Sequence, residues 1–392
     1  MTTDPASITG TWSFPTQVRF GPGRIRELAR VCKSLGMGHP LLITDPGLAE
    51  LPMVRDAISA NEAAGLPTGL FSEIKSNPVG RNVTDGLAEY RAGEHDGVIA
   101  FGGGSALDAA KVIAFMTAQT RTLWEFEDRG DNWKAANGDD IPPIVAVPTT
   151  AGTGSEVGRA GVITDETTHT KKIIFHPKML PAVVISDPEL TVGLPAHVTA
   201  ATGMDALAHC LEAYCAPGFH PMAEGIAVEG IRLVKEYLPR AVADGTDIAA
   251  RAAMLAAASM GSTAFQKGLG AIHSLSHPVG AIYDTHHGLT NAVVMPYVLA
   301  FNRPAIEDRM IRLAAWLGLP EPSFQAIMDW VLALRAALEI PATLTELGVG
   351  TERLDELAQM AADDPTAATN PVPAGPAEMK AMFEAAFQGR LP

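Results

Sequence analysis

The sequence predicts a Rossmann-like α/β domain with a parallel sheet, followed by an all-helical domain. Three observations support this fold class. Short apolar runs alternate with helical patterns in the first half of the chain, whereas the second half has long Ala-, Leu- and Met-rich helical patterns and no convincing strand. The chain is 392 residues long, 47% hydrophobic and 19% charged, which is enough for two or three domains with cores of their own. We place the domains at residues 1–190 and 191–392.

The first domain is built from apolar runs that have the length and composition of buried strands. These runs lie at 40–44, 97–101 and 144–147, and helical patterns lie at 23–35, 80–93 and 105–118. Strand–helix–strand alternation implies a parallel sheet with helices on both faces. Segments 160–164, 171–175 and 182–186 are expected to be further strands that extend or flank the sheet.

The second domain is expected to contain helices alone. Helical patterns lie at 197–215, 221–238, 247–264, 304–317, 323–338 and 376–388. Between the last two, residues 363–376 are rich in Pro, Ala and Thr. This composition predicts a surface loop before the last helix.

Charge and cysteine usage limit the partners and the compartment. The formal net charge is −15, from 29 basic and 44 acidic residues, and no basic run is present, so nucleic acid is not an expected partner. No run of 18 apolar residues and no secretory leader pattern is found, so we expect no membrane association. The three cysteines fit a reducing compartment, and the cytoplasm is the expected location.

A glycine-rich turn joins the second predicted strand to the helical pattern at 105–118. Gly102, Gly103 and Gly104 let a phosphate approach the backbone, and the helix N-terminus supplies N–H groups and a positive dipole. An ordinary tight turn, which needs only one or two glycines, is the alternative. The motif is not G-x-G-x-x-G, so the standard dinucleotide fingerprint is absent.

Two other strand ends carry polar groups suited to a nucleotide. The segment 148–156 offers hydroxyls at Thr149, Thr150 and Thr153, although a polar loop without a ligand has the same composition. Asp45 follows the first predicted strand. There it could accept both hydroxyls of a ribose and repel a 2′-phosphate, or it could simply initiate a turn before Pro and Gly.

Histidines are concentrated in one short stretch. Four of the eleven lie between residues 273 and 287, and His273 and His277 have the i,i+4 spacing of one helix face. Asp205 and His209 have the same spacing upstream, and His287 follows a plausible turn. One carboxylate and several imidazoles form the ligand set of a divalent transition metal, with hydrogen-bonded core histidines as the alternative. Glu212 shares the face of Asp205 and could support a ligand.

These motifs together resemble the iron-containing (group III) alcohol dehydrogenases. The resemblance covers nearly the whole chain, from Phe20-Gly21-Pro22-Gly23 through Asp187-Pro188-Glu189-Leu190 to Thr369-Asn370-Pro371. It implies a dehydroquinate synthase-like architecture, with a dinucleotide-binding α/β domain and a helical metal-binding domain. It also implies hydride transfer between a primary alcohol or short hydroxy acid and NAD.

The resemblance assigns site residues. The implied metal ligands are Asp205, His209, His273 and His287, and His277 matches a residue near the nicotinamide and substrate, so it is our candidate catalytic residue. Asp45 favours NAD over NADP. The metal implied is Fe²⁺, although imidazole and carboxylate also accept Zn²⁺. The implied cofactor contacts are Asp45, Asn77, Gly102, Gly103, Gly104, Ser105, Asp108, Thr149, Thr150, Thr153 and Lys171.

One branch of the family is more similar than the others. Segments 265–270, 285–288 and 156–159 resemble short-chain hydroxy-acid members such as 4-hydroxybutyrate dehydrogenase. Arg159 and Lys267 could bind a substrate carboxylate, or each could be a structural or surface cation. His286, beside one implied ligand, is a departure that complicates the metal assignment.

Two other functions remain to be weighed. A dehydroquinate synthase-like NAD-dependent lyase needs a Lys/Arg cluster for a polyanionic substrate, and residues 197–302 are poor in both. A non-catalytic nucleotide- or metal-binding protein would need a regulatory appendage, and none is visible. We expect a small alcohol, aldehyde or hydroxy acid as the substrate, and a homodimer or larger homo-oligomer.

Overall fold

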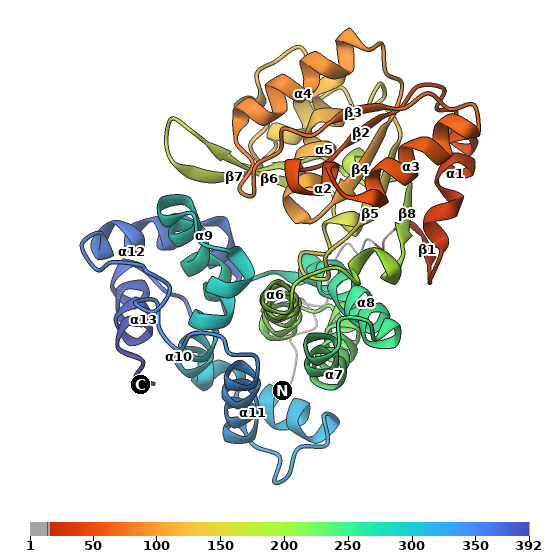
Figure 1. Cartoon of the computed structure of the whole chain (residues 1–392). Coiled ribbons are helices and arrows are strands. Elements are labelled where there is room, and N and C mark those ends of the chain that lie inside the picture. Colours follow the sequence, from red (N-terminus) through yellow and green to blue (C-terminus); the bar gives the residue numbers. More distant parts are fainter. Residues whose placement is uncertain (1–13, 15, 392) are drawn as a thin grey trace. The chain divides into compact units, whose positions relative to one another are not determined.

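The computed structural model describes residues 14 and 16–391, which form two compact units (Figure 1). The first unit is Phe14–Gly193 and the second begins at Leu194. Residues 1–13 of the expected first domain lie outside the described residues.

A six-stranded sheet forms the centre of the first unit. Every pairing in it is parallel, as the strand–helix alternation predicts. The strand order is β1-β8-β5-β4-β2-β3. The strands are β1 (Gln17–Phe20), β2 (Leu41–Ile43), β3 (Gly69–Phe71), β4 (Val98–Gly102), β5 (Ile144–Pro148) and β8 (Val183–Ser186), whereas β6 (Ala160–Asp165) and β7 (Thr170–Phe175) form a separate antiparallel pair.

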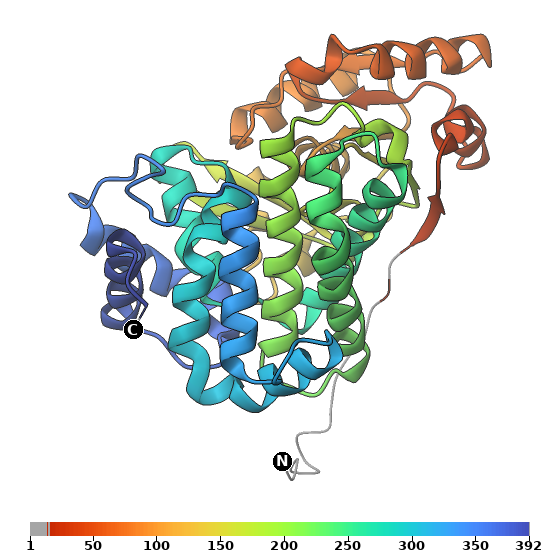
Figure 2. The same ribbon diagram turned by 60° about the horizontal axis from the view of Figure 1, so that its bottom comes forward.

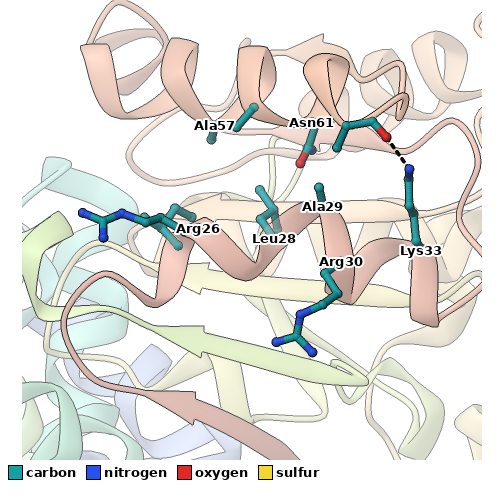
Figure 3. A pocket seen from close by; sticks show the side chains of 10 residues that line it. Arg26, Leu28, Ala29, Arg30, Lys33, Ala57 and Asn61 are labelled. Carbon is teal, nitrogen blue, oxygen red and sulfur yellow. Dashed lines mark hydrogen bonds between the residues drawn. The ribbon is translucent and has the colours of Figure 1, made fainter.

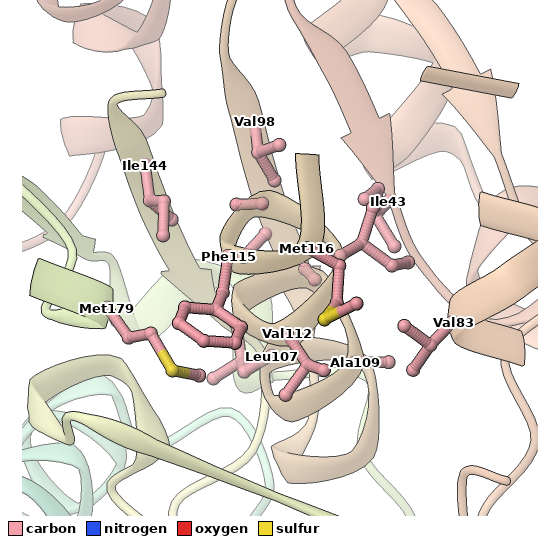
Figure 4. Close-up of a cluster of buried hydrophobic side chains, with 14 of the residues drawn as sticks. Ile43, Val83, Val98, Leu107, Ala109, Val112, Phe115, Met116, Ile144 and Met179 are labelled. Carbon is pink, nitrogen blue, oxygen red and sulfur yellow. The ribbon is translucent and has the colours of Figure 1, made fainter. Parts of the chain in front are cut away.

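Helices cover both faces of the sheet, which explains why the central strands read as continuous apolar runs. Leu41 and Ile43 of β2 point into a core with helices α4 (Gly80–Ala92) and α5 (Gly104–Thr117) (Figure 4). Leu42 points to the opposite core, formed with α1 (Leu28–Ser34) and α3 (Pro52–Ala63). This alternation follows from the period-2 geometry of a strand.

The elements of this unit that were not predicted include β1, β3 and α3. β1 and β3 are only 4 and 3 residues long and are partly exposed, so neither gives a buried apolar run. α3 has low overall hydrophobicity, and only Val54, Ala57 and Asn61 of it are buried.

A hollow of about 420 Å³ lies on the surface between α1 and α3 (Figure 3). Arg26, Arg30 and Lys33 contribute to its wall, together with small apolar residues. Two of these cations already have partners, because Arg30 pairs with Glu27 and Lys33 bonds to a backbone carbonyl. None of the glycine-loop residues lines the hollow, so it is separate from the expected nucleotide site.

The second unit is helical, as predicted. α6 is at its centre and packs against α7, α8 and α10 (Figure 2). Small residues permit this close packing, since a Cβ added at Gly203 would lie 2.2 Å from a methyl carbon of Leu238. The helices are α6 (Ala196–Cys215), α7 (Pro221–Ala243), α8 (Ile248–Ala264), α9 (Ala271–Tyr283), α10 (His287–Trp316), α11 (Phe324–Ala337), α12 (Leu354–Asp363) and α13 (Pro376–Gln388).

Internal prolines are the reason why parts of these helices were not predicted. The predicted helix at 304–317 is only the second half of α10, which continues through Pro296 and Pro304. α9 likewise contains Pro278. Proline usually ends or kinks a helix, so the sequence pattern favoured shorter elements.

The prediction of a surface loop at 363–376 is confirmed only in part, because most of the segment is exposed or half-buried but two of its residues are not. The segment contains a 3₁₀ helix, η9 (Pro365–Thr369), and Thr366 and Asn370 are buried. The amides of Asn370 and Asn302 on α10 bond reciprocally, with both N···O distances at 2.8 Å. Polar residues can be buried when each finds a partner, and composition does not reveal such pairing.

One helical segment, Ile248–Lys267, is long and apolar enough by composition to cross a membrane. The same test accepts the core helix of a globular protein, and 56% of the tested window is buried inside the structure. α8, which forms most of it, packs against α6 and α7.

Candidate metal centre and glycine loops

The metal-centre candidate starts from a close approach of α6 and α10. A Cβ added at Gly288 would lie 2.3 Å from the carbonyl oxygen of Ala201 and 2.9 Å from Cβ of Asp205. Only glycine fits at this distance. The approach brings His287, the first residue of α10, beside Asp205.

Three of the expected ligands come together in the second unit. Ligand atoms of Asp205, His273 and His287 all lie within 4.8 Å of one another. Nε2 of His287 is 3.6 Å from Oδ1 of Asp205, near the ~3.4 Å between two donors that are each about 2.1 Å from a tetrahedral ion. The donor chemistry and spacing therefore fit a divalent transition metal.

Glu212 supports His273 as the sequence suggested. Its Oε2 accepts a hydrogen bond from Nδ1 of His273 at 2.5 Å, and its Oε1 accepts the N–H of Ile272 at 2.6 Å. With the proton held on Nδ1, Nε2 keeps its lone pair for a cation. Burial disfavours a charge on His273, but the adjacent Glu212 and Asp205 outweigh it and raise the pKa of the imidazole.

The N-terminus of α9 is capped by side chains from distant parts of the chain. Besides the bond from Ile272 to Glu212, the N–H of Ala271 donates to Oδ1 of Asn370 at 3.1 Å. A Cβ added at Gly270 would lie 2.8 Å from this Asn370 oxygen. These contacts fix the start of the helix that carries His273 and His277.

The two remaining histidines of the prediction lie beside the three donors. The ring of His209 stacks on that of His273, with centroids 4.7 Å apart, but the three-donor group does not include it. His277 stacks on His287 at 5.4 Å, and its Nδ1 lies 2.8 Å from Oδ2 of Asp364. Asp364 was missed because it lies in the segment that was predicted to be a surface loop.

Asn291 was also missed. Its Nδ2 donates to Oδ1 of Asp205 at 2.8 Å and lies 3.1 Å from Nε2 of His287 and 3.4 Å from Nε2 of His273. Asn291 is fully buried and stands four residues after His287 on α10. This i,i+4 spacing is the sequence signal that could have found it.

Lys267 is engaged in a different network. Its Nζ pairs with Glu224 at 2.7 Å, and its side chain is 2% exposed. Burial lowers the pKa of Lys267, although the bond from Glu224 opposes this. Arg309 joins the same carboxylate at 3.0 Å. The burial and the ion pair of Lys267 favour the structural alternative, and its contact with a substrate carboxylate stays untested.

The glycine loop is in the first unit, where three strands end side by side. β2, β4 and β5 are neighbours and parallel, so the groups that follow them share one edge of the sheet. In open α/β sheets, ligands bind at the carboxyl ends of strands where the strand order reverses. The order reverses between β2 and β4, which is where Asp45 and Gly102 lie.

Each glycine of the loop stands where a side chain would be strained or would crowd a neighbouring residue. Gly102 has a φ of +147°, which L side chains rarely adopt. A Cβ at Gly104 would lie 2.4 Å from the Thr153 side chain, and a Cβ at Gly103 would lie 3.3 Å from Thr150. The second predicted loop thus packs directly on the first, and no side chain of the described chain caps the N-terminus of α5.

Asp108 and Asp45 bond to other parts of the protein. Asp108 accepts the N–H of Val162 at 2.9 Å and the hydroxyl of Ser155, and lies 3.4 Å from buried Lys111. Asp45 accepts the N–H of Leu48 at 3.0 Å as the N-cap of α2 (Pro46–Ala49). The turn chemistry considered for Asp45 is present, and its suggested ribose contact stays a prediction.

The other expected cofactor residues also lie in the first unit. Asn77 is in the connection from β3 to α4, and Lys171 is on β7. The Ser105 hydroxyl donates to the carbonyl of Ser76, and Thr149 donates its N–H to the Gly102 carbonyl at 3.0 Å.

Comparison with known proteins gives the family. The family described as iron-containing alcohol dehydrogenase matches residues 15–188, and the C-terminal part of the Fe-containing alcohol dehydrogenase family matches residues 199–387. The chain belongs to the iron-containing alcohol dehydrogenase family. It is therefore an oxidoreductase of this type, as the combined motifs predict.

Curated relatives agree with this assignment. The chain is 40% identical to 4-hydroxybutyrate dehydrogenase of Cupriavidus necator over 94% of this chain and 97% of the relative. It is 37% identical to NAD-dependent methanol dehydrogenase of Bacillus methanolicus, covering 90% and 93% of the two chains. The predicted cofactors, iron and NAD, agree with the family description and with the second relative.

A solved structure of 1,3-propanediol oxidoreductase matches with a TM-score of 0.92 and 34% identity, covering 97% of this chain and 100% of that one. The predicted fold class is confirmed. These comparisons support a dehydrogenase and support neither a lyase nor a non-catalytic binding protein.

Proposed function

We propose that this protein oxidises a short hydroxy acid or primary alcohol with NAD, and reduces the corresponding aldehyde in the reverse direction. The observation that carries the proposal is the convergence of Asp205, His273 and His287 in a chain of the iron-containing alcohol dehydrogenase family. Similarity to 4-hydroxybutyrate dehydrogenase favours a hydroxy acid as the substrate.

In this proposal, four residues hold a divalent cation, Fe²⁺ rather than Zn²⁺. They are the three convergent donors and His209, whose ring already lies against His273. When bound, the cation acts as a Lewis acid that polarises the substrate oxygen. Glu212 keeps Nε2 of His273 available as a donor.

His277 is proposed as the catalytic residue that exchanges the substrate proton with solvent. Its ring stacks on His287, and its Nδ1 is bonded to Asp364, so Nε2 is the nitrogen that accepts or donates the proton. An imidazole nitrogen can both accept and donate a proton, which such an exchange needs.

NAD is proposed to bind at the glycine loop and to accept the hydride. The N-terminus of α5 would hold its phosphates, and the carboxylate of Asp45 would disfavour the extra phosphate of NADP. The hydroxyl loop lies against the glycines and would contribute its threonines. The proposed contacts are Asp45, Asn77, Gly102, Gly103, Gly104, Ser105, Asp108, Thr149, Thr150, Thr153 and Lys171.

Arg159 is proposed to bind a substrate carboxylate, because Lys267 is already neutralised by Glu224. The Arg159 guanidinium carbon lies 5.4 Å from the centroid of the Phe175 ring, a geometry that keeps a planar cation oriented.

The deciding experiment combines metal analysis with an initial-rate panel. The panel contains simple primary alcohols, diols and ω-hydroxy acids, each with NAD and with NADP. We expect one bound cation per chain and the highest kcat/KM for hydroxy acids with NAD. The His273→Ala variant should lose metal and activity together while still binding NAD. Full turnover by that variant would show that the ligand assignment is wrong.

We also propose a homodimer or larger homo-oligomer that acts in the cytoplasm. β1 is at the edge of the six-stranded sheet, and Val18 and Phe20 on it are 37% and 42% exposed. An edge strand with exposed apolar side chains is suited to pairing with a second chain. Light scattering after size-exclusion chromatography measures the assembly directly.

A further inference from the structure

We propose that Asp364 is a positioning residue that fixes the tautomer of His277, so that the lone pair for proton exchange is on Nε2. The inference rests on the proposed function of His277. It concerns a residue outside the expected ligand and cofactor sets.

The geometry defines which nitrogen carries the proton. Oδ2 of Asp364 lies 2.8 Å from Nδ1 of His277, and an ionised carboxylate can only accept, so Nδ1 must donate. The side chains of His277 and Asp364 are 12% and 9% exposed, so water competes weakly for this bond. The ring planes of His277 and His287 differ by only 19°, which adds a stacking contact that restricts the ring.

The other oxygen of Asp364 is committed elsewhere. Oδ1 accepts the N–H of Thr366 at 2.9 Å and its hydroxyl at 2.5 Å. These two bonds make Asp364 the N-cap of η9 and leave only Oδ2 for His277. Burial opposes ionisation of Asp364, but His277 and Thr366 outweigh it and hold the pKa of the carboxyl below its ordinary value.

This arrangement serves both directions of the reaction. When an alcohol is oxidised, Nε2 takes up its proton, and the imidazolium that forms lies against a carboxylate. In the reverse direction the same imidazolium returns the proton from Nε2. A histidine in the opposite tautomer has its proton already on Nε2 and cannot accept another there.

Asp364→Asn is the most informative variant because it reverses the tautomer and keeps the cap. Thr366 donates twice to Oδ1, so the amide oxygen must remain there and the NH₂ group must face His277. That NH₂ donates to Nδ1, which places the ring proton on Nε2. Asn is as good an N-cap residue as Asp, so η9 is retained.

The first readout is the ¹⁵N NMR spectrum of histidine-labelled enzyme loaded with Zn²⁺, with His277 assigned by its absence in His277→Ala. We expect Nδ1 protonated in the parent and Nε2 protonated in Asp364→Asn. The matched control is Asp363→Asn, the same change one residue earlier, where the side chain is exposed and bonds to Gln359. The control should leave the His277 signals unchanged. An unchanged tautomer in Asp364→Asn would overturn the proposal.

The second readout is kinetic. Asp364→Asn should lower kcat about 10²- to 10⁴-fold, with KM within about 2-fold, the usual span for a misplaced general base. Metal content and melting temperature should match the parent. In a His277→Ala background the same change should have no further effect on kcat.

The outcomes separate this inference from the function on which it rests. An equal loss from Asp364→Asn with and without His277 would refute the positioning role and leave the function of His277 intact. Full turnover by His277→Ala alone would refute that function, and the NMR result would still decide whether Asp364 sets the tautomer.

Discussion

Replacing Glu212 with Gln should weaken metal binding about 10- to 100-fold. Oε1 and Oε2 each accept a buried hydrogen bond, from Ile272 N–H and from Nδ1–H of His273. A Gln side chain has only one oxygen. One orientation places two donors against each other at Ile272, and the other forces the His273 proton onto Nε2, which removes a metal donor.

The expected loss of metal affinity follows from the one hydrogen bond that Gln at position 212 cannot form. A buried hydrogen bond to a charged group contributes about 1.5–3 kcal/mol, which corresponds to a factor of about 10–100 in an equilibrium constant. Loss of a group that orients a metal-binding histidine has the same typical cost.

The assay is competition for the cation between the protein and a chromophoric chelator, with Zn²⁺ or Fe²⁺ under anaerobic conditions. Glu236→Gln on α7 is a suitable control, because that side chain is half exposed and pairs only with Arg232 among the contacts described. Metal affinity in Glu212→Gln equal to that of the parent and of this control would refute the reasoning.

Three other perturbations test separate parts of the structure. Gly288→Ala should destabilise the helical unit by about 1–3 kcal/mol, because its Cβ would overlap the neighbouring backbone of α6; urea unfolding measures this, and an unchanged midpoint would contradict it. Asn291→Asp places a second carboxylate beside Asp205, so the melting temperature should fall in chelator and rise more than that of the parent when Zn²⁺ is added; equal shifts would argue against this placement. Burial alone would raise the pKa of Asp165, but its bond to Lys172 on β7 outweighs this and lowers the pKa. The stabilisation of the fold by this ion pair is therefore present above pH ~4 and is lost as the pH falls through the lowered pKa. Asp165→Asn should therefore flatten the acid limb of a stability–pH curve, and an identical limb would exclude the effect.

The spacing of apolar residues predicted those helices and strands in which a single pattern covers the whole element. The strands near Leu42, Ile99 and Val145 are buried on both faces, so each gives an unbroken apolar run. β1 and β3 are short edge strands and give no such run. α10 carries two prolines, and its burial rather than its propensity stabilises it.

The metal donors were accessible to sequence reasoning because Asp205 and His209 share one helix face, and His273 shares another with His277. The groups that orient the donors were less accessible. Glu212 was found because it shares a helix with Asp205. Asp364 lies 87 residues from its partner His277, in a segment whose composition is that of a loop. Sequence spacing carries information within one helix, whereas contacts between distant segments depend on tertiary packing that no local pattern encodes.

The reciprocal amide pair between Asn302 and Asn370 has a consequence for proteolysis. It anchors a stretch of chain that supplies no metal donor but holds the start of α9 and the ring of His277. Cleavage within 365–376 would leave all four proposed donors covalently connected in one fragment. A nicked enzyme of this kind should retain its cation and lose turnover, so a metal assay alone would report damaged protein as intact.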